Sequence, residues 1–468
     1  MNMAEFFKQI SPLPKAQRRV IFYLAVLFFL ILMPLIVLYS IGYNFDLKTG
    51  HVVRTGGIFI KTNQNSFKLF INNNLAKESG VLSFGALVAN LKPDLYSVRV
   101  EKEGFRPWQR VIHVTPESIN EFRSVLLIPE IIKEEEVLNL TRRNLSIEKV
   151  EILKESRWFL INAPERRALS YLFNPERKAF DAIEVFDYFR WDTEKQRLLV
   201  KRGGPTRFAA VNLAGGRVQE TQLRVPANIG RVTMADFGQG ADEFFLLTDQ
   251  NFLWRFDRAK KTTKQILSDV HFFRVAGGRV LFVTNEGFLF SANPDGEEIE
   301  NYGRKGFYLT DRPAEMVMTP DGSLFLLDSA GGFFVRRKDE PEVVPLAGNI
   351  IGADFSQDDE RLLFWSENSV EVLWIVDEKQ APFRKAGARE RILSLSEEKV
   401  GHAAWFGDKE YNVIFSAGKF IGVVDIDNRG GGPQATIIFD QGDGIFDYDS
   451  SENEILRASG SFLYSSSF

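Results

Sequence analysis

The sequence predicts a mainly β protein with one N-terminal transmembrane helix, a small β-sandwich and a β-propeller. Three observations predict it. Residues 20–45 carry no charge, and residues 56–129 alternate between apolar and polar as strands do. Over residues 137–468, a sequence pattern of an apolar strand end, a polar turn and a second apolar strand recurs roughly every 42 residues. The chain has 468 residues, 44% hydrophobic and 26% charged, a composition typical of folded proteins.

The uncharged segment begins at Val20 and ends at Phe45. As a helix it would span about 39 Å, enough for the ~30 Å hydrocarbon core of a lipid bilayer. The preceding residues 1–19 carry an excess of Lys and Arg, which predicts a cytoplasmic tail with all later domains extracellular or periplasmic. A cleaved signal peptide and a buried soluble helix are the alternatives. The run is longer than the apolar core of a usual signal peptide, which favours the membrane span.

Residues 56–129 predict a small antiparallel β domain. Segments 57–60, 67–71, 96–100, 110–114 and 122–128 have the apolar content or alternation of strands. Asn72, Asn73 and Asn74 predict a tight turn, because Asn tolerates a positive φ.

Residues 91–105 (LKPDLYSVRVEKEGF) carry a proline turn, an alternating strand and a Gly followed by an aromatic residue. This pattern resembles the PEGA domain family, and the later Arg106, Pro107 and Trp108 fit it as well. The chain departs from the family at Asp94, where Gly is usual. The resemblance covers about a sixth of the chain. It implies an envelope-exposed, accessory and non-catalytic β-sandwich of a bacterial protein, and it supplies no catalytic residue.

From residue 137 onward, an apolar or aromatic residue ends a strand, a polar turn follows, and another apolar strand begins. The residues that end the first strand are Leu153, Trp191, Phe237, Val275, Met318, Phe355, Trp405 and Tyr448. The spacing fits one four-stranded propeller blade per copy, whereas a helical repeat would need 3.6 periodicity.

The last copy has three strands, and residues 137–140 form an isolated strand before the first copy. Pairing these segments would close the ring and remove both sheet edges. We therefore predict eight blades, with seven as the alternative. The array resembles TolB-type and WD-repeat-like propellers in period and turn placement. That resemblance implies a scaffold with a central channel and binding faces, without implying an activity.

Composition excludes several kinds of chemistry. The absence of Cys excludes thiol catalysis, disulfides and Cys-ligated metals. The four His are too widely separated for an HExxH zinc site, and the net charge of -4 gives no basis for nucleic-acid binding. We predict no catalytic, cofactor-binding or metal-binding residue and no cofactor.

Acidic segments 425–428, 440–443 and 447–449 raise calcium binding as an alternative to ordinary solvated turns. Asp192, Asp321 and Asp358 recur at similar blade positions, and we expect them to accept hydrogen bonds from the backbone. We expect the seven Trp to pack in the core, residues 428–433 to form a loop, and the paired glycines at 203–204, 215–216 and 277–278 to form hairpin turns.

These features predict a non-catalytic scaffold anchored in the cell membrane. Its propeller would bind an envelope protein or a cell-wall polysaccharide. The alternative is a hydrolase or lyase with a carboxylate-based site at the channel mouth, which would need polar groups converging at one face. A third interpretation is a sensor acting through a membrane partner, since the cytoplasmic tail is too short for a signalling domain.

Overall fold

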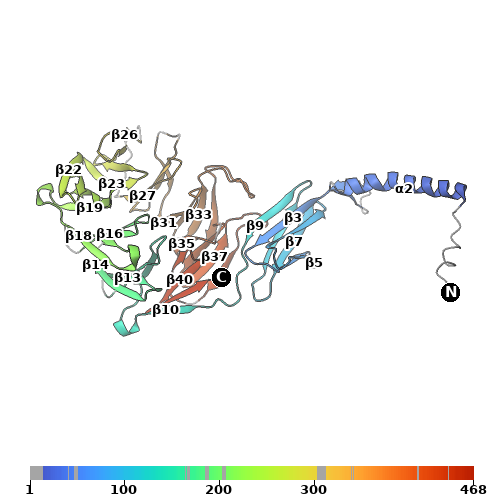
Figure 1. The fold of residues 1–468 in the computed structure, drawn as a ribbon, viewed down its shortest axis with the longest axis horizontal. Coiled ribbons are helices and arrows are strands. Elements are labelled where there is room, and N and C mark those ends of the chain that lie inside the picture. The colour runs from blue at the N-terminus through green and yellow to red at the C-terminus, as the bar shows by residue number, and fades with distance from the viewer. Residues whose placement is uncertain are drawn as a thin grey trace, which may run out of the picture. The chain divides into compact units, whose positions relative to one another are not determined.

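The computed structural model describes residues 14–40, 42–46, 51–163, 165, 169–184, 189–202, 207–302, 313–338, 340, 342–407, 410–440 and 442–467. The chain divides into two compact units, Met1–Leu127 and Ile128–Phe468. The first contains the long helix α2 and a small β domain, and the second consists almost entirely of strands (Figure 1).

After its basic first turn, helix α2 (Lys15–Ser40) is apolar around its circumference, and nearly all of its described side chains are exposed. Its Lys15–Leu38 segment is long and apolar enough to cross a membrane, a property that signal sequences share. The helix begins and ends five residues earlier than the predicted segment. Pro34 lies inside it without ending it.

The prediction of helix up to Phe45 is wrong, because the backbone leaves the helical path at Gly42, where φ is 89°. Strand β1 (Tyr43–Asp46) follows and pairs with β2 (His51–Arg54). The Thr55 amide donates to the Gly42 carbonyl at 2.7 Å, and Arg54 Nε donates to Tyr43 Oη at 2.8 Å. These bonds attach the end of the helix to the small β domain.

The small β domain has two sheets with one core between them. The first has the order β6-β3-β9 and the second β5-β4-β7-β8. The strands are β3 (Gly56–Thr62), β4 (Lys68–Ile71), β5 (Asn74–Glu78), β6 (Gly85–Leu91), β7 (Asp94–Glu101), β8 (Trp108–Val114) and β9 (Ile119–Val125). Asn72 and Asn73 both have positive φ, as the predicted turn requires.

The structure corrects the expectation of a purely antiparallel domain, since β3 and β9 pair in parallel. A parallel pair needs a long crossover connection, and the chain supplies it by building the other sheet between these two strands. The sequence interpretation also missed β5 and β6. Every residue of β5 is exposed, so its sequence lacks the alternation that marks a half-buried strand.

Within the described residues, the second unit contains eight four-stranded antiparallel sheets, which are the propeller blades. Blades one to four are built from β11 (Lys149–Ile152), β12 (Phe159–Asn162), β13 (Leu169–Asn174), β14 (Ala179–Glu184); β15 (Phe189–Asp192), β16 (Arg197–Lys201), β17 (Phe208–Asn212), β18 (Gln219–Leu223); β19 (Val232–Phe237), β20 (Glu243–Thr248), β21 (Leu253–Asp257), β22 (Thr262–Leu267); and β23 (Val270–Ala276), β24 (Arg279–Thr284), β25 (Leu289–Ala292), β26 (Glu300–Asn301).

Blades five to eight are built from β27 (Pro313–Met318), β28 (Leu324–Asp328), β29 (Phe333–Arg336), β30 (Val344–Ala347); β31 (Ile350–Phe355), β32 (Arg361–Ser366), β33 (Ser369–Trp374), β34 (Arg389–Ser394); β35 (Val400–Phe406), β36 (Asn412–Ala417), β37 (Phe420–Asp425), β38 (Ala435–Phe439); and β39 (Ile445–Asp449), β40 (Glu454–Ser459), β41 (Phe462–Ser467) with β10 (Glu135–Asn139). Short 3-10 helices occur at η2 (Thr141–Arg143), η4 (Ala214–Gly216) and η5 (Ala227–Ile229).

Blade eight closes the ring as the sequence predicts. Strand β10 pairs with β41, and the sheet order is β10-β41-β40-β39. In Figure 1 the teal strand β10 accordingly lies beside the red strands of this blade. Arg457 Nε and Nη2 donate to the two carboxylate oxygens of Glu134 at 2.6 and 2.9 Å, and Glu134 lies immediately before β10. The first and last parts of the propeller therefore share one sheet.

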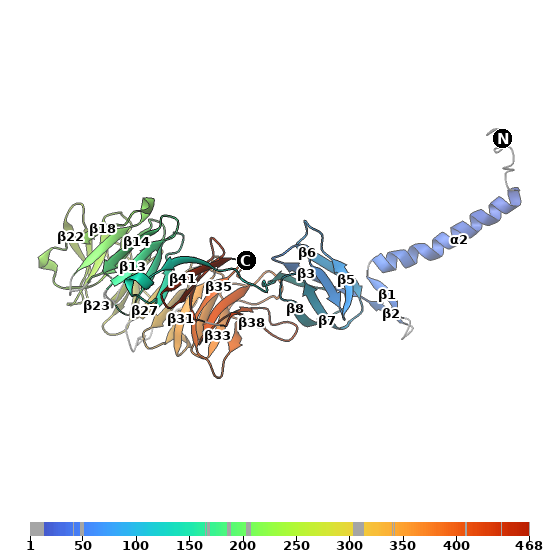
Figure 2. The same cartoon turned by 90° about the horizontal axis from the view of Figure 1, so that it is seen from below.

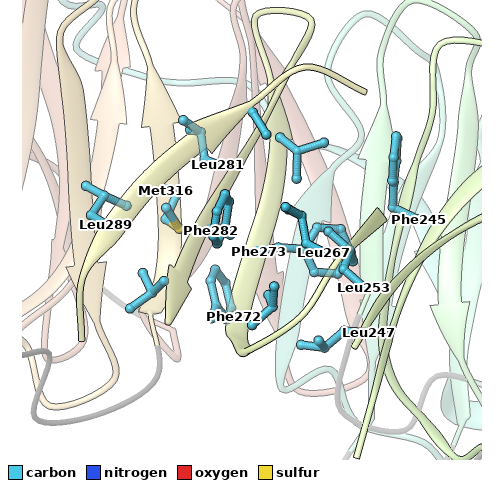
Figure 3. Close-up of a cluster of buried hydrophobic side chains, with 14 of the residues drawn as sticks. Phe245, Leu247, Leu253, Leu267, Phe272, Phe273, Leu281, Phe282, Leu289 and Met316 are labelled. Atoms are coloured by element: carbon cyan, nitrogen blue, oxygen red, sulfur yellow. The ribbon is translucent and has the colours of Figure 1, made fainter. Parts of the chain in front are cut away.

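The hydrophobic core lies between successive blades. Figure 3 shows one such cluster, in which Phe245 of blade three, Phe273 and Phe282 of blade four and Met316 of blade five pack together. A similar cluster joins blade one to blade eight through Leu463. The first strands of several neighbouring blades contact each other, for example β11 with β39 and β31 with β35. We call the first strands of the eight blades the inner strands, and Figure 2 labels β23, β27, β31 and β35 among them.

Candidate functional site

The inner strands carry charged side chains that face one another across blade boundaries. Asp236 of blade three is buried, and its Oδ2 lies 4.0 Å from Arg190 Nε of blade two and 3.9 Å from Arg274 Nη1 of blade four. Oδ2 also accepts the Val275 amide at 3.2 Å. Burial raises the pKa of Asp236, against the lowering effect of Arg190 and the backbone donors. This aspartate joins three blades.

Asp447 plays the same role where the ring closes. Its Oδ2 accepts the Ile152 amide of blade one at 2.6 Å, and its Oδ1 accepts the Tyr448 amide at 2.8 Å. His402 Nε2 of blade seven lies 3.7 Å from Oδ1. Asp236 and Asp447 thus each bind the backbone of the next inner strand. We missed this repeated role because the two aspartates lie inside strands and not in turns.

An ion pair joins blade one to blade six, which are not neighbours in the ring. Lys154 follows β11 in blade one, and its Nζ lies 3.0 Å from Oδ1 of Asp354 in β31 of blade six. Blades seven and eight separate these two blades along the ring, so the pair reaches across the axis. The charge of Asp354 raises the pKa of Lys154, although partial burial opposes the shift.

A cavity of about 120 Å³ lies beside this ion pair, between blades five and six. Its apolar wall is formed by Val317, Phe325, Leu327, Phe333, Ala353 and Phe355. Its charged lining residues are Lys154, Glu315 and Asp354. We call this cavity the interblade pocket. Its lining combines aliphatic and aromatic side chains with a few charged groups, as binding sites for small groups commonly do.

Glu315 is the third charged residue that lines the pocket. No hydrogen bond or ion pair joins its carboxylate to another residue in the described part of the chain. The surrounding protein raises the pKa of Glu315, and the neighbouring Asp354 adds to this, while Arg190 and Lys154 oppose it. The side chain is nevertheless accessible to solvent. A carboxyl group of this kind is a candidate binding group.

A second exposed feature lies between β33 and β34 of blade six. Phe383 is 70% exposed at the tip of this loop. The loop is held by internal bonds, since the Glu378 amide donates to the Arg384 carbonyl at 2.8 Å and Lys385 Nζ lies 2.7 Å from Asp377. Arg384 Nη2 also donates to Asn428 of blade seven at 2.6 Å. We call residues 375–388 the Phe383 loop.

The predicted role of the turn aspartates is confirmed. The Asp192, Asp321 and Asp358 carboxylates accept the amides of Lys195, Ser323 and Glu360 at 3.2, 3.0 and 3.0 Å. Partial burial would raise the pKa of Asp321, but hydrogen bonds from Thr319 and Ser323 outweigh it and lower the pKa.

The acidic segments that raised calcium binding are engaged in local bonds. Asp427 binds the Arg429 side chain, Asp443 accepts the Gly460 amide, and Asp449 accepts the Ser451 amide. No group of three or more His, Asp or Glu suited to a metal ion occurs among the described residues. Gln441 and the 203–204 glycine pair lie outside the described residues.

All seven Trp lie within the described part of the chain, and none is exposed. Four of them are buried, namely Trp158, Trp365, Trp374 and Trp405. A platform for stacking sugar rings needs exposed aromatic faces, so the tryptophans offer no such platform to a polysaccharide.

No family model matches the chain, and no curated protein matches it. The PEGA resemblance therefore rests on residues 91–108 alone. Among solved structures, the C-terminal WD40 domain of Sif2 has 8% identity and a TM-score of 0.45, and the match covers 72% of this chain and 99% of that one.

The propeller domain of Myceliophteria thermophila Cps50 (Swd1) has 13% identity and a TM-score of 0.40, covering 73% of this chain and 100% of that one. YCF48 bound to a D1 peptide has 10% identity and a TM-score of 0.35, covering 72% and 95%. These similarities concern the fold alone, and our assignment of the propeller rests on the strand pairing.

Proposed function

We propose that this chain is a non-catalytic scaffold that is anchored in a membrane by α2 and binds a protein partner through its propeller. The Phe383 loop carries the proposal. An aromatic side chain that is exposed on an ordered loop provides a large apolar contact at little entropic cost, and such residues dominate the energy of protein interfaces. Propellers commonly serve as protein-binding scaffolds, an analogy at the level of fold.

The length and apolar character of α2 support the membrane anchor, and the basic residues Lys15, Arg18 and Arg19 at its start support a cytoplasmic N-terminus. The resemblance of residues 91–105 to the PEGA family supports an envelope location for the part that follows. The partner is then an envelope protein on the outer side of the membrane.

The partner is tested with a photoreactive phenylalanine analogue at position 383 of the full chain in intact cells. The matched control carries the analogue at Ile299, which is 55% exposed and lies in blade four. We expect one recurrent protein adduct from position 383 that position 299 does not give. Its purified form should bind Phe383→Ala at least tenfold more weakly than the wild type, as for a hot-spot residue. Equal adducts at both positions, or unchanged affinity of the variant, would refute the proposal.

The orientation is tested with single cysteines, since the chain has no Cys of its own. An impermeant maleimide should label Glu148→Cys on the propeller surface and leave Asn2→Cys unlabelled until the membrane is opened. If Asn2→Cys were labelled first, the propeller would be on the cytoplasmic side and the proposed location would be wrong.

A further inference from the structure

We propose that the end of the small β domain that is attached to α2 contacts the lipid surface, with Leu95 and Ile119 inserted among the lipid headgroups. This inference rests on the proposed function, because it takes α2 to be the membrane anchor. The domain then stands on the bilayer by one end and does not swing freely about the end of the helix. Three observations support this contact.

The first observation is that hydrogen bonds hold this end of the domain at the end of the helix. Thr55, the residue before β3, donates to the Gly42 carbonyl through its amide and through its hydroxyl, each at 2.7 Å. Gly42 follows α2 by only two residues. The Thr55 carbonyl accepts the Glu117 amide at 3.0 Å, which attaches the loop between β8 and β9 to the same place. With α2 across a bilayer, this end of the domain therefore lies at the level of the headgroups.

The second observation is an exposed apolar residue on each outer face of the domain at this end. Leu95, the second residue of β7, is 60% exposed, and Ile119, the first residue of β9, is 52% exposed. Strand alternation sets them opposite the core residues Val98 and Phe122, so they face outward from two different sheets. Strand β7 begins opposite the end of β8, and Ile119 pairs with Gly57 at the start of β3. One apolar residue on each face suits an end-on contact with a flat surface, whereas a sideways contact needs several on one face.

The third observation is the charge of this end. The charged side chains that the structure describes around the two apolar residues are Arg54, Lys92, Asp94 and Glu117. Arg54 pairs with Glu117, and the four charges sum to zero. Attraction to anionic lipids needs clusters of Lys and Arg, so a neutral end with exposed apolar residues suits zwitterionic headgroups. Tyr43, which accepts a hydrogen bond from Arg54, adds an aromatic residue of the kind enriched at membrane interfaces.

The test uses the full chain in phosphatidylcholine vesicles, with a nitrobenzoxadiazole fluorophore on single cysteines. The fluorophore is placed at Leu95→Cys or Ile119→Cys. Leu82→Cys is the matched control, because Leu82 is 96% exposed in the loop between β5 and β6, next to the opposite end of β3. Ile31→Cys, inside α2, reports whether the anchor itself enters the bilayer.

Lipids with a nitroxide on the headgroup should quench the fluorophore at positions 95 and 119 about threefold more than at position 82, as expected for side chains at the interface. Lipids with a nitroxide deep in the acyl chain should quench position 31 most. Quenching at 31 without quenching at 95 and 119, or equal quenching at 82, would overturn the inference and leave the anchor standing. No other protein is present, so residues that face a protein partner would also stay unquenched. Absence of quenching at 31 would refute the anchor, and the inference would fall with it.

A second measurement tests the two side chains without placing a fluorophore on them. The fluorophore at Pro116→Cys, in the exposed loop between β8 and β9, reports how close this end lies to the headgroups. Leu95→Asn combined with Ile119→Asn should lower its quenching about threefold. Leu75→Asn combined with Leu82→Asn removes exposed apolar groups elsewhere on the same domain and should not change it. Circular dichroism checks that each variant is folded, and unchanged quenching in the folded variant of Leu95 and Ile119 would overturn the inference.

Discussion

Arg361→Ala should loosen the junction between blades six and seven. Arg361 is only 4% exposed, although its side chain is charged. Its Nη1 donates to the Glu410 carbonyl of blade seven at 2.8 Å. Its guanidinium lies 5.2 Å from the ring centre of Trp405 and 4.7 Å from that of Tyr411. One side chain of blade six thus binds the backbone and two rings of the next blade.

The expected loss in free energy of unfolding is about 3–5 kcal/mol. A hydrogen bond from a charged donor contributes about 1.5–3 kcal/mol, and each partly desolvated cation–π contact about 0.5–2 kcal/mol. The ion pair with Asp358 adds little, since that carboxylate is half exposed and 3.5 Å away. The contributions share one side chain and are therefore not additive.

Chemical denaturation followed by Trp fluorescence measures the loss, because Trp405 reports on the same junction. Arg361→Lys keeps the charge without the planar fork and should lie between wild type and Arg361→Ala. Arg142→Ala is the matched control on the exposed surface and should change stability by less than about 0.5 kcal/mol. If Arg361→Ala were as stable as Arg142→Ala, the junction would not depend on this arginine.

The loss should also depend on pH. Burial raises the pKa of Glu410 to about 6, and the Arg361 charge opposes this rise. Without Arg361 the pKa of Glu410 rises further. This rise lowers the stability of the protein only at pH values where the wild-type carboxyl is ionised. Arg361→Ala is therefore expected to cost more at pH 8 than at pH 5. An equal cost at both pH values would show that the two groups are not coupled.

Three further predictions concern single residues. Because the pKa of Glu410 is raised from 4.5 to about 6 in the folded protein, the protein loses stability as pH rises through this range. Glu410→Gln should therefore remove a fall of up to about 2 kcal/mol from the free energy of unfolding measured against pH. Arg457→Ala removes the bidentate bond to Glu134 and should speed proteolysis near β10 and lower the unfolding midpoint. Gly352→Ala would place a Cβ 2.2 Å from the Trp365 ring and should cost about 1–3 kcal/mol, with a changed near-UV circular dichroism spectrum.

Two of these predictions have a matched control variant. Glu148→Gln, whose carboxyl is exposed, should leave the pH profile unchanged. Gly348→Ala is the control for Gly352→Ala, because a Cβ there would meet no atom within 4 Å. The first prediction is contradicted if Glu410→Gln keeps the wild-type dependence of stability on pH. The second is contradicted if β10 resists proteolysis in Arg457→Ala as well as it does in the wild type. The third is contradicted if Gly352→Ala and Gly348→Ala are equally stable.

The propeller is predictable because each blade repeats its own local signals. The end of every inner strand is marked by a large apolar residue and a polar turn, and the isolated segment 137–140 indicates the closure through its sequence pattern alone. The parallel pairing of β3 with β9 leaves no such local signal. It depends on where the chain returns after building another sheet.

The candidate site was not predictable for a related reason. Lys154 and Asp354 are 200 residues apart, and only the curvature of the ring brings them together. Glu315 interrupts an apolar strand, which is a signal, but its role depends on the pocket formed with the next blade. Phe383 is the one aromatic residue of its loop, and its exposure depends on the bonds that hold that loop.

The closure of blade eight has a mechanical consequence. The chain enters the propeller through β10, so a pulling force applied to the N-terminal unit reaches the ring first at Glu134 and its bond to Arg457. Strand β10, which completes the last sheet, is also the strand that connects the propeller to the N-terminal unit. Tension along the chain would act on the pairing of β10 with β41 before it acted on any other blade, so the first part of the propeller to bear the load is the seam of the ring.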